Sequence, residues 1–188
     1  MELILIRHGL PVRSAETDDP PLSDEGHDQA RRVGARLGAE KIDTVWASTM
    51  RRAVETAQPF AAAAGHEVRT SPGIVEFDRG SGAYTPMEVL KREDYAAWKA
   101  FVDNGYGDMD VFARLVVETL EGIVADNSGK TVAVFCHGGV INAWTSHVLG
   151  MPPRLFFEPK YASVHRFLCA RSGERNLVSL NDIGHLRS

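Results

Sequence analysis

Two short apolar runs, far apart in the chain, most constrain what this sequence can fold into. One is ELILI at residues 2–6 and the other is TVAVFC at 131–136, and branched side chains dominate both. Runs of this length and composition are typical of strands that are buried on both faces of a parallel sheet. Because helical patterns lie between them, the sequence predicts a three-layer α/β/α sandwich around a mainly parallel central sheet.

The remaining elements follow from apolar periodicity, helix caps and turn residues. Ser23 is a suitable N-cap, and a further strand is expected at 41–48. Helices are expected at about 24–38, 50–64, 86–102, 109–126 and after His137. Residues 66–85 lack a sustained period and are interpreted as a loop.

The C-terminal part and the chain length complete the expected architecture. The segments SVHRFLCA and NLVSL flank RSGE, which indicates a hairpin added at an edge of the sheet. A chain of 188 residues fits a single domain over 1–188. Within it, the segment at about 77–106 is expected to leave the sheet and cover a pocket.

Charge and cysteine content exclude several classes of partner. A formal charge of −4 and a pI near 6.0 argue against a nucleic-acid surface. No apolar run approaches the ~18 residues of a membrane span, so we expect no membrane partner and a cytoplasmic protein. Cys136 and Cys169 have neither disulfide nor zinc-site spacing, and Cys136 is interpreted as core packing. A homodimer could form through an edge strand or the terminal hairpin.

The residues that follow the two apolar runs are the first indication of function. Arg7 and His8 end the first run, and His137 follows the second. Carboxyl ends of neighbouring parallel strands meet at one edge of a sheet, so the two histidines should lie close together. Gly138 then opens a helix, whose N-terminal amides and dipole favour an anion. Arg7 carries a fork of donors that matches phosphate oxygens.

A second arginine should reach this anion from another strand end. Arg51 and Arg52 both lie in the first turn of the helix after 41–48, and one of them can point into the site. A metal pair formed by His8 and His137 is not favoured, because neither has a carboxylate or histidine at ligand spacing. The other histidines are expected to be solvated or hydrogen-bonded; they are His27, His66, His147, His165 and His185.

Four motifs in order resemble those of the histidine phosphatase superfamily, the phosphoglycerate-mutase-like fold. They are RHG at 7–9, PLSDEGHDQA at 21–30, which resembles PLTxxGxxQA, STMRRAVETA at 48–57, which resembles SPLxRAxQTA, and CHGG at 136–139. The resemblance covers nearly the whole chain. It implies that His8 is the nucleophile, that Arg7, Arg52 and His137 bind the phosphate, and that Arg51 lies on the helix surface.

The resemblance also implies an acid and marks two departures. The family's glutamate lies four residues before a glycine, and VEFDRGSG places Glu76 at that position, with Asp78 as a competitor. Gly82 and Ala83 replace the tryptophan and acidic residue of many members. Ser14 stands where an asparagine often touches phosphate, and a serine can still donate one hydrogen bond.

These residues together predict a metal-independent phosphomonoesterase that needs no cofactor. Neutral His8, with its other ring N–H held by a backbone carbonyl, would attack phosphorus and form phosphohistidine. Arg7, Arg52, His137 and the Gly138 amide would meet the phosphoryl charge, and Glu76 would act as acid and then base. The substrate would be a small-molecule phosphate ester. The alternatives are a cofactor-dependent phosphoglycerate-mutase-type phosphotransferase and a non-catalytic module that binds a phosphorylated ligand.

Aromatic side chains in the covering segment bear on the substrate. They are Phe77, Tyr84, Tyr95 and Trp98. Such residues more often pack a helix, but if they face the site they favour a substrate with an apolar or planar surface over a bare sugar phosphate.

Overall fold

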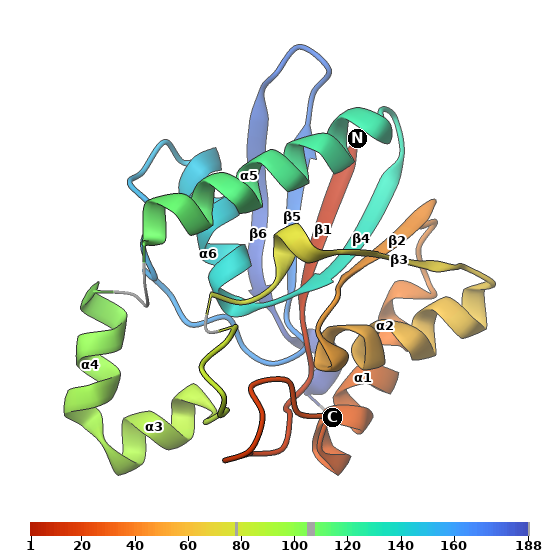
Figure 1. The fold of residues 1–188 in the computed structure, drawn as a ribbon. Helices are drawn as coiled ribbons and strands as arrows, with labels where there is room; N and C mark the ends of the chain where they lie inside the picture. The colour runs from red at the N-terminus through yellow and green to blue at the C-terminus, as the bar shows by residue number, and fades with distance from the viewer. Residues whose placement is uncertain (78, 105–107, 188) are drawn as a thin grey trace.

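The computed structural model describes residues 1–77, 79–104 and 108–187, and it contains a six-stranded sheet with helices on both faces (Figure 1). The strands are β1 (Glu2–Arg7), β2 (Thr44–Ser48), β3 (Val68–Ser71), β4 (Thr131–Cys136), β5 (Val164–Cys169) and β6 (Arg175–Asp182). Their order in the sheet is β3-β2-β4-β1-β5-β6. The first four are mutually parallel, and β5 and β6 are antiparallel additions at one edge. The predicted α/β/α sandwich with a mainly parallel sheet is therefore confirmed.

The helices are α1 (Asp24–Leu37), α2 (Arg51–Ala64), α3 (Met87–Glu93), α4 (Tyr95–Asn104), α5 (Met109–Asp126) and α6 (Gly138–Val148). Helices α1 and α2 pack on one face of the sheet, and α5 and α6 pack on the other. Two short 3₁₀ turns complete the described chain, η1 (Pro72–Ile74) and η2 (Gly184–Leu186). In Figure 1, α3 and α4 stand apart from both layers, beyond the lower end of the sheet.

The side-chain alternation of β1 explains why the sheet is covered on both faces. Ile4 and Ile6 belong to the apolar cluster shared with α1 and α2, whereas Leu3 and Leu5 belong to the cluster shared with α5 and α6. Burial of such a side chain contributes roughly 1.5–3 kcal/mol relative to its exposure. A strand that must be apolar on both faces shows no polar alternation, which is the pattern of ELILI.

Local signals placed most helix ends correctly. The Ser23 side chain accepts a hydrogen bond from the Gly26 amide at 3.1 Å, so it caps α1 as predicted, and Gly38 follows the last residue of that helix. Helix α5 has the predicted bounds. Gly9 and Gly26 come from two different motifs, and their backbones meet so closely that a Cβ on Gly9 would lie 2.6 Å from the Gly26 carbonyl oxygen.

Two predictions about secondary structure were wrong. The stretch 66–85 was expected to be a loop, but it contains β3, a short edge strand that exists because its backbone pairs with β2. The single helix expected at 86–102 is two helices that are separated at Asp94. The Asp94 carboxylate accepts from the Ala97 amide at 2.9 Å, and such a side-chain cap starts a new helix.

Among the residues that the structure describes, no helix has both the length and the apolar character required to cross a membrane.

Candidate active site

The predicted residues come together at the carboxyl ends of the four parallel strands. Arg7 is the last residue of β1 and His8 follows it, while Arg52 lies in the first turn of α2, directly after β2. Glu76 follows β3 and η1, and His137 follows β4. This edge is where open α/β sheets hold their ligands.

His8 is buried and held in one tautomer. Its Nδ1 lies 2.7 Å from the Gly9 carbonyl oxygen, so Nδ1 carries the proton, as expected for a ring held by a backbone carbonyl. The Arg52 Nε–H donates to His8 Nε2 at 3.3 Å. Burial, together with the charges of Arg52 and Arg7, holds the pKa of His8 well below its usual range. The ring is therefore neutral at pH 7 and presents a lone pair on Nε2.

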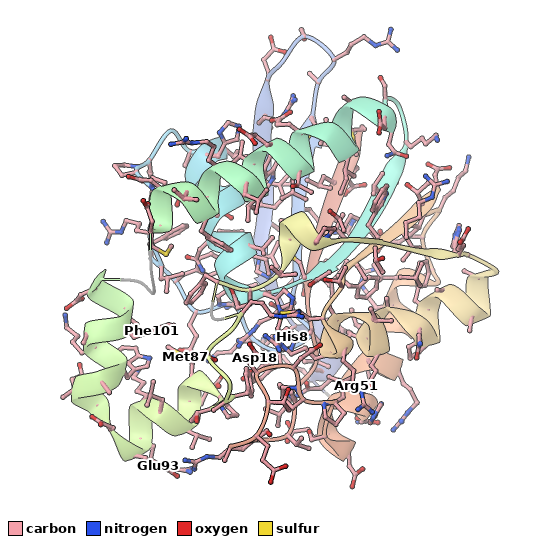
Figure 2. The ribbon with its side chains drawn as sticks, viewed as in Figure 1. His8, Asp18, Arg51, Met87, Glu93 and Phe101 are labelled. Atoms are coloured by element: carbon pink, nitrogen blue, oxygen red, sulfur yellow. The ribbon has the colours of Figure 1, made fainter. Side chains whose placement is uncertain are left out.

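Of the two neighbouring arginines, Arg52 is the one that reaches His8. Its side chain is fully buried, and Nη1 donates to the Asp18 carbonyl oxygen at 2.8 Å. Arg51 instead lies on the helix surface, where its Nε donates to Glu55 Oε1 at 2.6 Å. Figure 2 shows Arg51 directed away from His8.

Arg7 is fixed between a backbone carbonyl and an aromatic ring. Its Nη1 donates to the Pro159 carbonyl oxygen, and its guanidinium carbon lies 3.9 Å from the centre of the Tyr161 ring. Glu88 lies 4.0 Å from the same Nη1. Arg7 Nε is buried and has no hydrogen-bond partner among the described residues.

His137 is a neutral donor beside the cationic pole that Arg7 and Arg52 form. Its ring centre lies 5.1 Å from that of His8, and within the described part of the chain neither of its buried ring nitrogens has a hydrogen-bond partner. Burial, followed by the charge of Arg52, lowers its pKa well below the usual value, so the ring is neutral. Buried polar atoms are nearly always hydrogen-bonded. An anion here would satisfy the Arg7 Nε–H and the single N–H of a neutral His137.

Glu76 lies beside this pole and is held by backbone amides. Both carboxylate oxygens accept from the Gly139 N–H at 3.1 Å, and Oε1 also accepts from the Phe77 N–H at 3.1 Å. A Cβ on Gly139 would lie 2.2 Å from Glu76 Oε1, so only glycine leaves room for the carboxylate. Glu76 Oε2 and Arg7 Nε each lie 3.8 Å from the position that a Cβ on Gly138 would occupy. The acid and the guanidinium therefore flank one point.

Two further residues that the sequence predicts for the site, Asp78 and Ser14, are not placed in it by the structure. Asp78, the competing acid, lies outside the described residues. Ser14 pairs its backbone with Tyr84, and its hydroxyl accepts from the amides of Glu16 and Thr17 at 3.2 Å. These contacts fix the loop after β1, and the Ser14 hydroxyl donates no hydrogen bond to another of the described residues. Phosphate binding by Ser14 stays a prediction.

Three positioning residues were missed by sequence reasoning. Tyr161 packs on Arg7 and lies 5.7 Å from the His8 ring centre, yet no local pattern marks it. Thr56 accepts from the Gly9 N–H at 3.0 Å and donates to the Arg52 carbonyl at 2.7 Å. It lies in the STMRRAVETA motif, which was its available signal.

Asn142 is the third residue that was missed. Its amide nitrogen donates to the carbonyls of Gly138 and Phe157, and its oxygen accepts from the amides of Phe156 and Phe157. It thereby ties the loop after α6 to the start of that helix. Only the fold brings these segments together.

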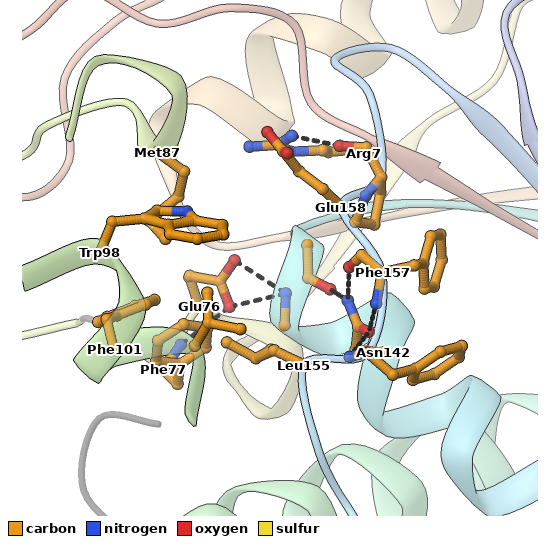
Figure 3. A pocket seen from close by; sticks show the side chains of 15 residues that line it. Arg7, Glu76, Phe77, Met87, Trp98, Phe101, Asn142, Leu155, Phe157 and Glu158 are labelled. Carbon is orange, nitrogen blue, oxygen red and sulfur yellow. Dashed lines mark hydrogen bonds between the residues drawn. The ribbon is translucent and has the colours of Figure 1, made fainter. Parts of the chain in front are cut away.

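Helices α3 and α4, with the residues that lead into them from Glu76, form a helical excursion from the sheet. A pocket of about 250 Å³ adjoins Glu76 on the side of this helical excursion (Figure 3). Its apolar lining includes Met87, Trp98, Phe101, Val102 and Leu155. Of the aromatics singled out from the sequence, Phe77 and Trp98 line this pocket. Tyr84 instead packs 4.9 Å from the Arg52 guanidinium carbon, and Tyr95 is 59% exposed.

The remaining histidines and cysteines lie away from the site or in the core. His165 is buried and hydrogen-bonded, with Nδ1 accepting from the Asn181 amide at 3.2 Å and Nε2 lying 2.8 Å from the Ser163 hydroxyl. Cys136 is buried in the core, and burial raises the pKa of its thiol. Within 1–77, 79–104 and 108–187, no group of three or more His, Cys, Asp or Glu side chains is placed to hold a metal ion.

Comparisons with known proteins identify the family and the fold of this chain. The model of the histidine phosphatase superfamily (branch 1) matches residues 3–183. Phosphoglycerate mutase-like protein 4 of Arabidopsis thaliana is 32% identical over 157 residues, which are 76% of this chain and 68% of that protein. Phosphoserine phosphatase 1 of Hydrogenobacter thermophilus is 31% identical over 165 residues, 80% of this chain and 77% of that protein. The structure of Bacillus stearothermophilus YhfR has a TM-score of 0.81 at 22% identity and 99% coverage of both chains, which shows a shared fold.

Proposed function

This chain belongs to the histidine phosphatase superfamily, and we propose that it hydrolyses phosphate monoesters of small molecules through a phosphohistidine on His8, without a metal or a cofactor. The observation that carries the proposal is the state of His8. Its neutral ring presents the Nε2 lone pair, and Arg7 and Arg52 surround it with buried positive charge. A neutral nucleophile beside fixed cations is what attack on a phosphate dianion requires.

In the first step, the Arg52 Nε–H moves from His8 Nε2 to a phosphate oxygen, Nε2 attacks phosphorus, and the bond from phosphorus to the ester oxygen breaks. Arg7, Arg52 and His137 donate to the equatorial oxygens, with the Gly138 amide at the helix N-terminus, so charge is met by groups that are already in place. Breakage leaves the phosphoryl group on Nε2 and the electron pair on the departing alkoxide.

Glu76 supplies the proton transfers. Its protonated carboxyl donates to the departing alkoxide, which leaves as the alcohol, and the carboxylate then accepts a proton from the water that attacks phosphohistidine. The second step releases inorganic phosphate and restores His8 and the protonated Glu76. Such proton transfer typically contributes ~10²- to 10⁴-fold to the rate. Support comes from the position of Glu76 Oε2, which lies 3.8 Å from the same point beside Gly138 as Arg7 Nε does.

The relatives' names leave a phosphoglycerate mutase as the second candidate. A mutase must retain a second anionic group of its bisphosphate cofactor while the first is transferred. The pocket beside Glu76 offers apolar side chains, with Arg7 as the single cationic residue in its described lining. This lining supports hydrolysis over transfer.

The test is phosphate release from a panel of monoesters in EDTA, with wild type beside His8→Ala. Turnover in the chelator that disappears in the variant is the expected result, and protein denatured at alkaline pH during turnover should carry acid-labile phosphate on wild type alone. Isomerisation of 3-phosphoglycerate with catalytic 2,3-bisphosphoglycerate, in excess of phosphate release, would instead establish the mutase. Phosphate binding without turnover on any substrate would establish the binding module.

A further inference from the structure

The site has two halves that meet at Glu76. Arg7, Glu76 and Gly138 border the phosphate pole and also line the apolar pocket. Because Glu76 protonates the departing oxygen in the proposed function, the alcohol part of the ester must extend past this carboxylate. The pocket is the space on that side (Figure 3). The residues that line it therefore indicate which chemical class of leaving alcohol the site accepts.

The wall of this pocket is apolar and largely aromatic. Met87 from α3 and Trp98, Phe101 and Val102 from α4 form the side that faces Leu155. In Figure 3 the Trp98 indole and Phe101 lie across the cavity from Leu155, with Glu76 between them. Lys91 lies against the Trp98 ring with its Nζ 4.4 Å from the ring centre, and it is outside the pocket lining.

The charges around the pocket disfavour a second anion on the alcohol. Its charged lining residues are Arg7, Glu76 and Glu158. Arg7 is engaged by Pro159, Glu88 and the proposed phosphate, and the Asn142 amide has bonds from both of its ends. A carboxylate on the alcohol would lie among acidic groups with no free cation in the described lining. Burial of an unpaired charge is costly.

The apolar wall is also linked to the acid. Phe101 packs on Phe77 with ring centres 5.1 Å apart, and Phe77 packs edge-on against Phe112 at 5.6 Å. Phe77 is the residue whose backbone N–H donates to Glu76 Oε1. An alcohol seated on Phe101 therefore lies against the aromatic cluster that contains Phe77, the residue whose backbone N–H holds the acid.

From these observations, and resting on the proposed phosphatase function, we propose that the substrates are monophosphate esters of uncharged alcohols with an apolar ring or branched body. Trp98 and Phe101 then determine specificity by packing on that body. The phosphoserine and phosphoglycerate named for relatives carry a carboxylate and are predicted to be poor substrates.

A matched series of esters tests the proposal. Propyl, 3-phenylpropyl and 3-carboxypropyl phosphate are all esters of primary alcohols, so the leaving oxygen is alike and the distal group alone differs. Burial of one phenyl group predicts that kcat/KM for the phenylpropyl ester exceeds that for the propyl ester by roughly 10- to 100-fold. The carboxypropyl ester should fall below the propyl ester.

Variants in α4 test whether its aromatic side chains cause the preference for the phenylpropyl ester. Trp98→Ala and Phe101→Ala should each lower the ratio of phenylpropyl to propyl kcat/KM by at least about threefold, because each removes part of the aromatic wall. Lys99→Ala is the control, since it removes an exposed side chain from the same helix outside the pocket lining, and the ratio should be retained. Glu158→Gln should raise the relative kcat/KM of the carboxypropyl ester roughly 2- to 5-fold.

The outcomes separate the two proposals. If release depends on His8 but the phenylpropyl and propyl esters react equally, or the carboxypropyl ester is best, this inference is overturned and the phosphatase stands. An unchanged ratio in both α4 variants also overturns it. If no ester is hydrolysed, the phosphatase proposal fails, and calorimetric Kd values for the same three esters decide whether the pocket prefers the phenyl group.

Discussion

The two halves of the site differ in how the fold holds them. The side chains of His8, Arg52 and His137 are buried at the ends of strands whose apolar residues fill both core clusters. In contrast, none of the described side chains of α3 and α4 is buried. The phosphate half is thus part of the core, whereas the pocket wall is an addition to it. In the proposed function, the sheet therefore fixes the chemistry, and the choice of alcohol can change with little cost to folding.

Three contacts fasten the helical excursion to the site. Tyr84 pairs its backbone with Ser14, Glu88 accepts from the Tyr161 hydroxyl at 3.2 Å, and Phe101 packs on Phe77. Of these partners, Tyr161 packs on Arg7, which is proposed to bind the phosphate, and Phe77 directly follows Glu76, the proposed acid. The excursion is therefore positioned relative to the reacting atoms even though it contributes little to the core.

Removal of the nucleophile should give the largest effect. We expect His8→Ala to lower kcat at least ~10³-fold, because no covalent intermediate can form. Steady-state phosphate release measures this loss, and circular dichroism checks that the fold persists. His27→Ala, an exposed histidine outside the site, is the control and should retain activity. A fully active His8→Ala protein would disprove the nucleophile.

Removal of the acid should have the next largest effect. Glu76→Gln keeps the shape and loses the proton, so kcat should fall ~10²- to 10⁴-fold on esters of poor leaving groups. The loss should shrink on 4-nitrophenyl phosphate, whose leaving oxygen needs little protonation. Asp78→Asn is the matched variant. A larger loss in Asp78→Asn than in Glu76→Gln would transfer the acid role to Asp78.

Displacement of the acid without removing it should cost less. Gly139→Ala places a Cβ 2.2 Å from Glu76 Oε1 and 2.3 Å from Phe77 Cδ1, so the carboxyl must move. A displacement of this kind predicts a ~10²-fold loss of kcat with a smaller change in KM. At Gly138 the nearest atoms lie 3.8 Å away, so Gly138→Ala should lose less activity. Equal losses in the two variants would contradict the positioning role of Gly139.

A buried histidine of the sheet, His165 in β5, should make the stability of the fold depend on pH in the acidic range. Burial lowers the pKa of His165 to about 3, from 6.5 in an unfolded chain, so the unfolded state binds more protons between these values. Stability is therefore fully present above pH 6.5 and is lost as the pH falls through this window, by about 2 kcal/mol for this group at about pH 5. Urea unfolding at several pH values measures the slope.

His165→Gln keeps a donor for Ser163 and an acceptor for the Asn181 amide, but it does not titrate. The slope of unfolding free energy against pH should therefore fall by about 1.4 kcal/mol per pH unit below pH 6.5 in this variant. An unchanged slope would show that His165 is not the group responsible.

The smallest effect is expected on the free energy of unfolding when a side chain of the pocket wall is truncated. Trp98→Ala should change the free energy of unfolding by less than ~1 kcal/mol, because the side chain is only half-buried and lies outside the core clusters. Phe135→Ala, in the fully buried core, should cost ~3–5 kcal/mol. Similar losses in the two variants would erase the distinction between the halves.

Local patterns predicted much of this molecule. The apolar runs gave β1 and β4, Ser23 gave the start of α1, and the hairpin signature gave β5 and β6. Asp94 was a local signal that was overlooked, because apolar spacing continues across it while its carboxylate caps α4. Strand β3 could not be read locally, since its four residues are ordered by pairing with β2.

The sequence by itself determined the central strands β1 and β4, the strand ends at which His8 and His137 lie and, through the resemblance of its motif to that of the family, the choice of Arg52. These features depend on residues that are neighbours in the chain, and periodicity and spacing record such neighbours. Tertiary structure alone decided the rest: Tyr161 against Arg7, the glycine that admits Glu76, and the apolar pocket between α4 and Leu155. Those contacts join segments that are far apart in the chain, and their free energy depends on packing in three dimensions, which no local pattern encodes.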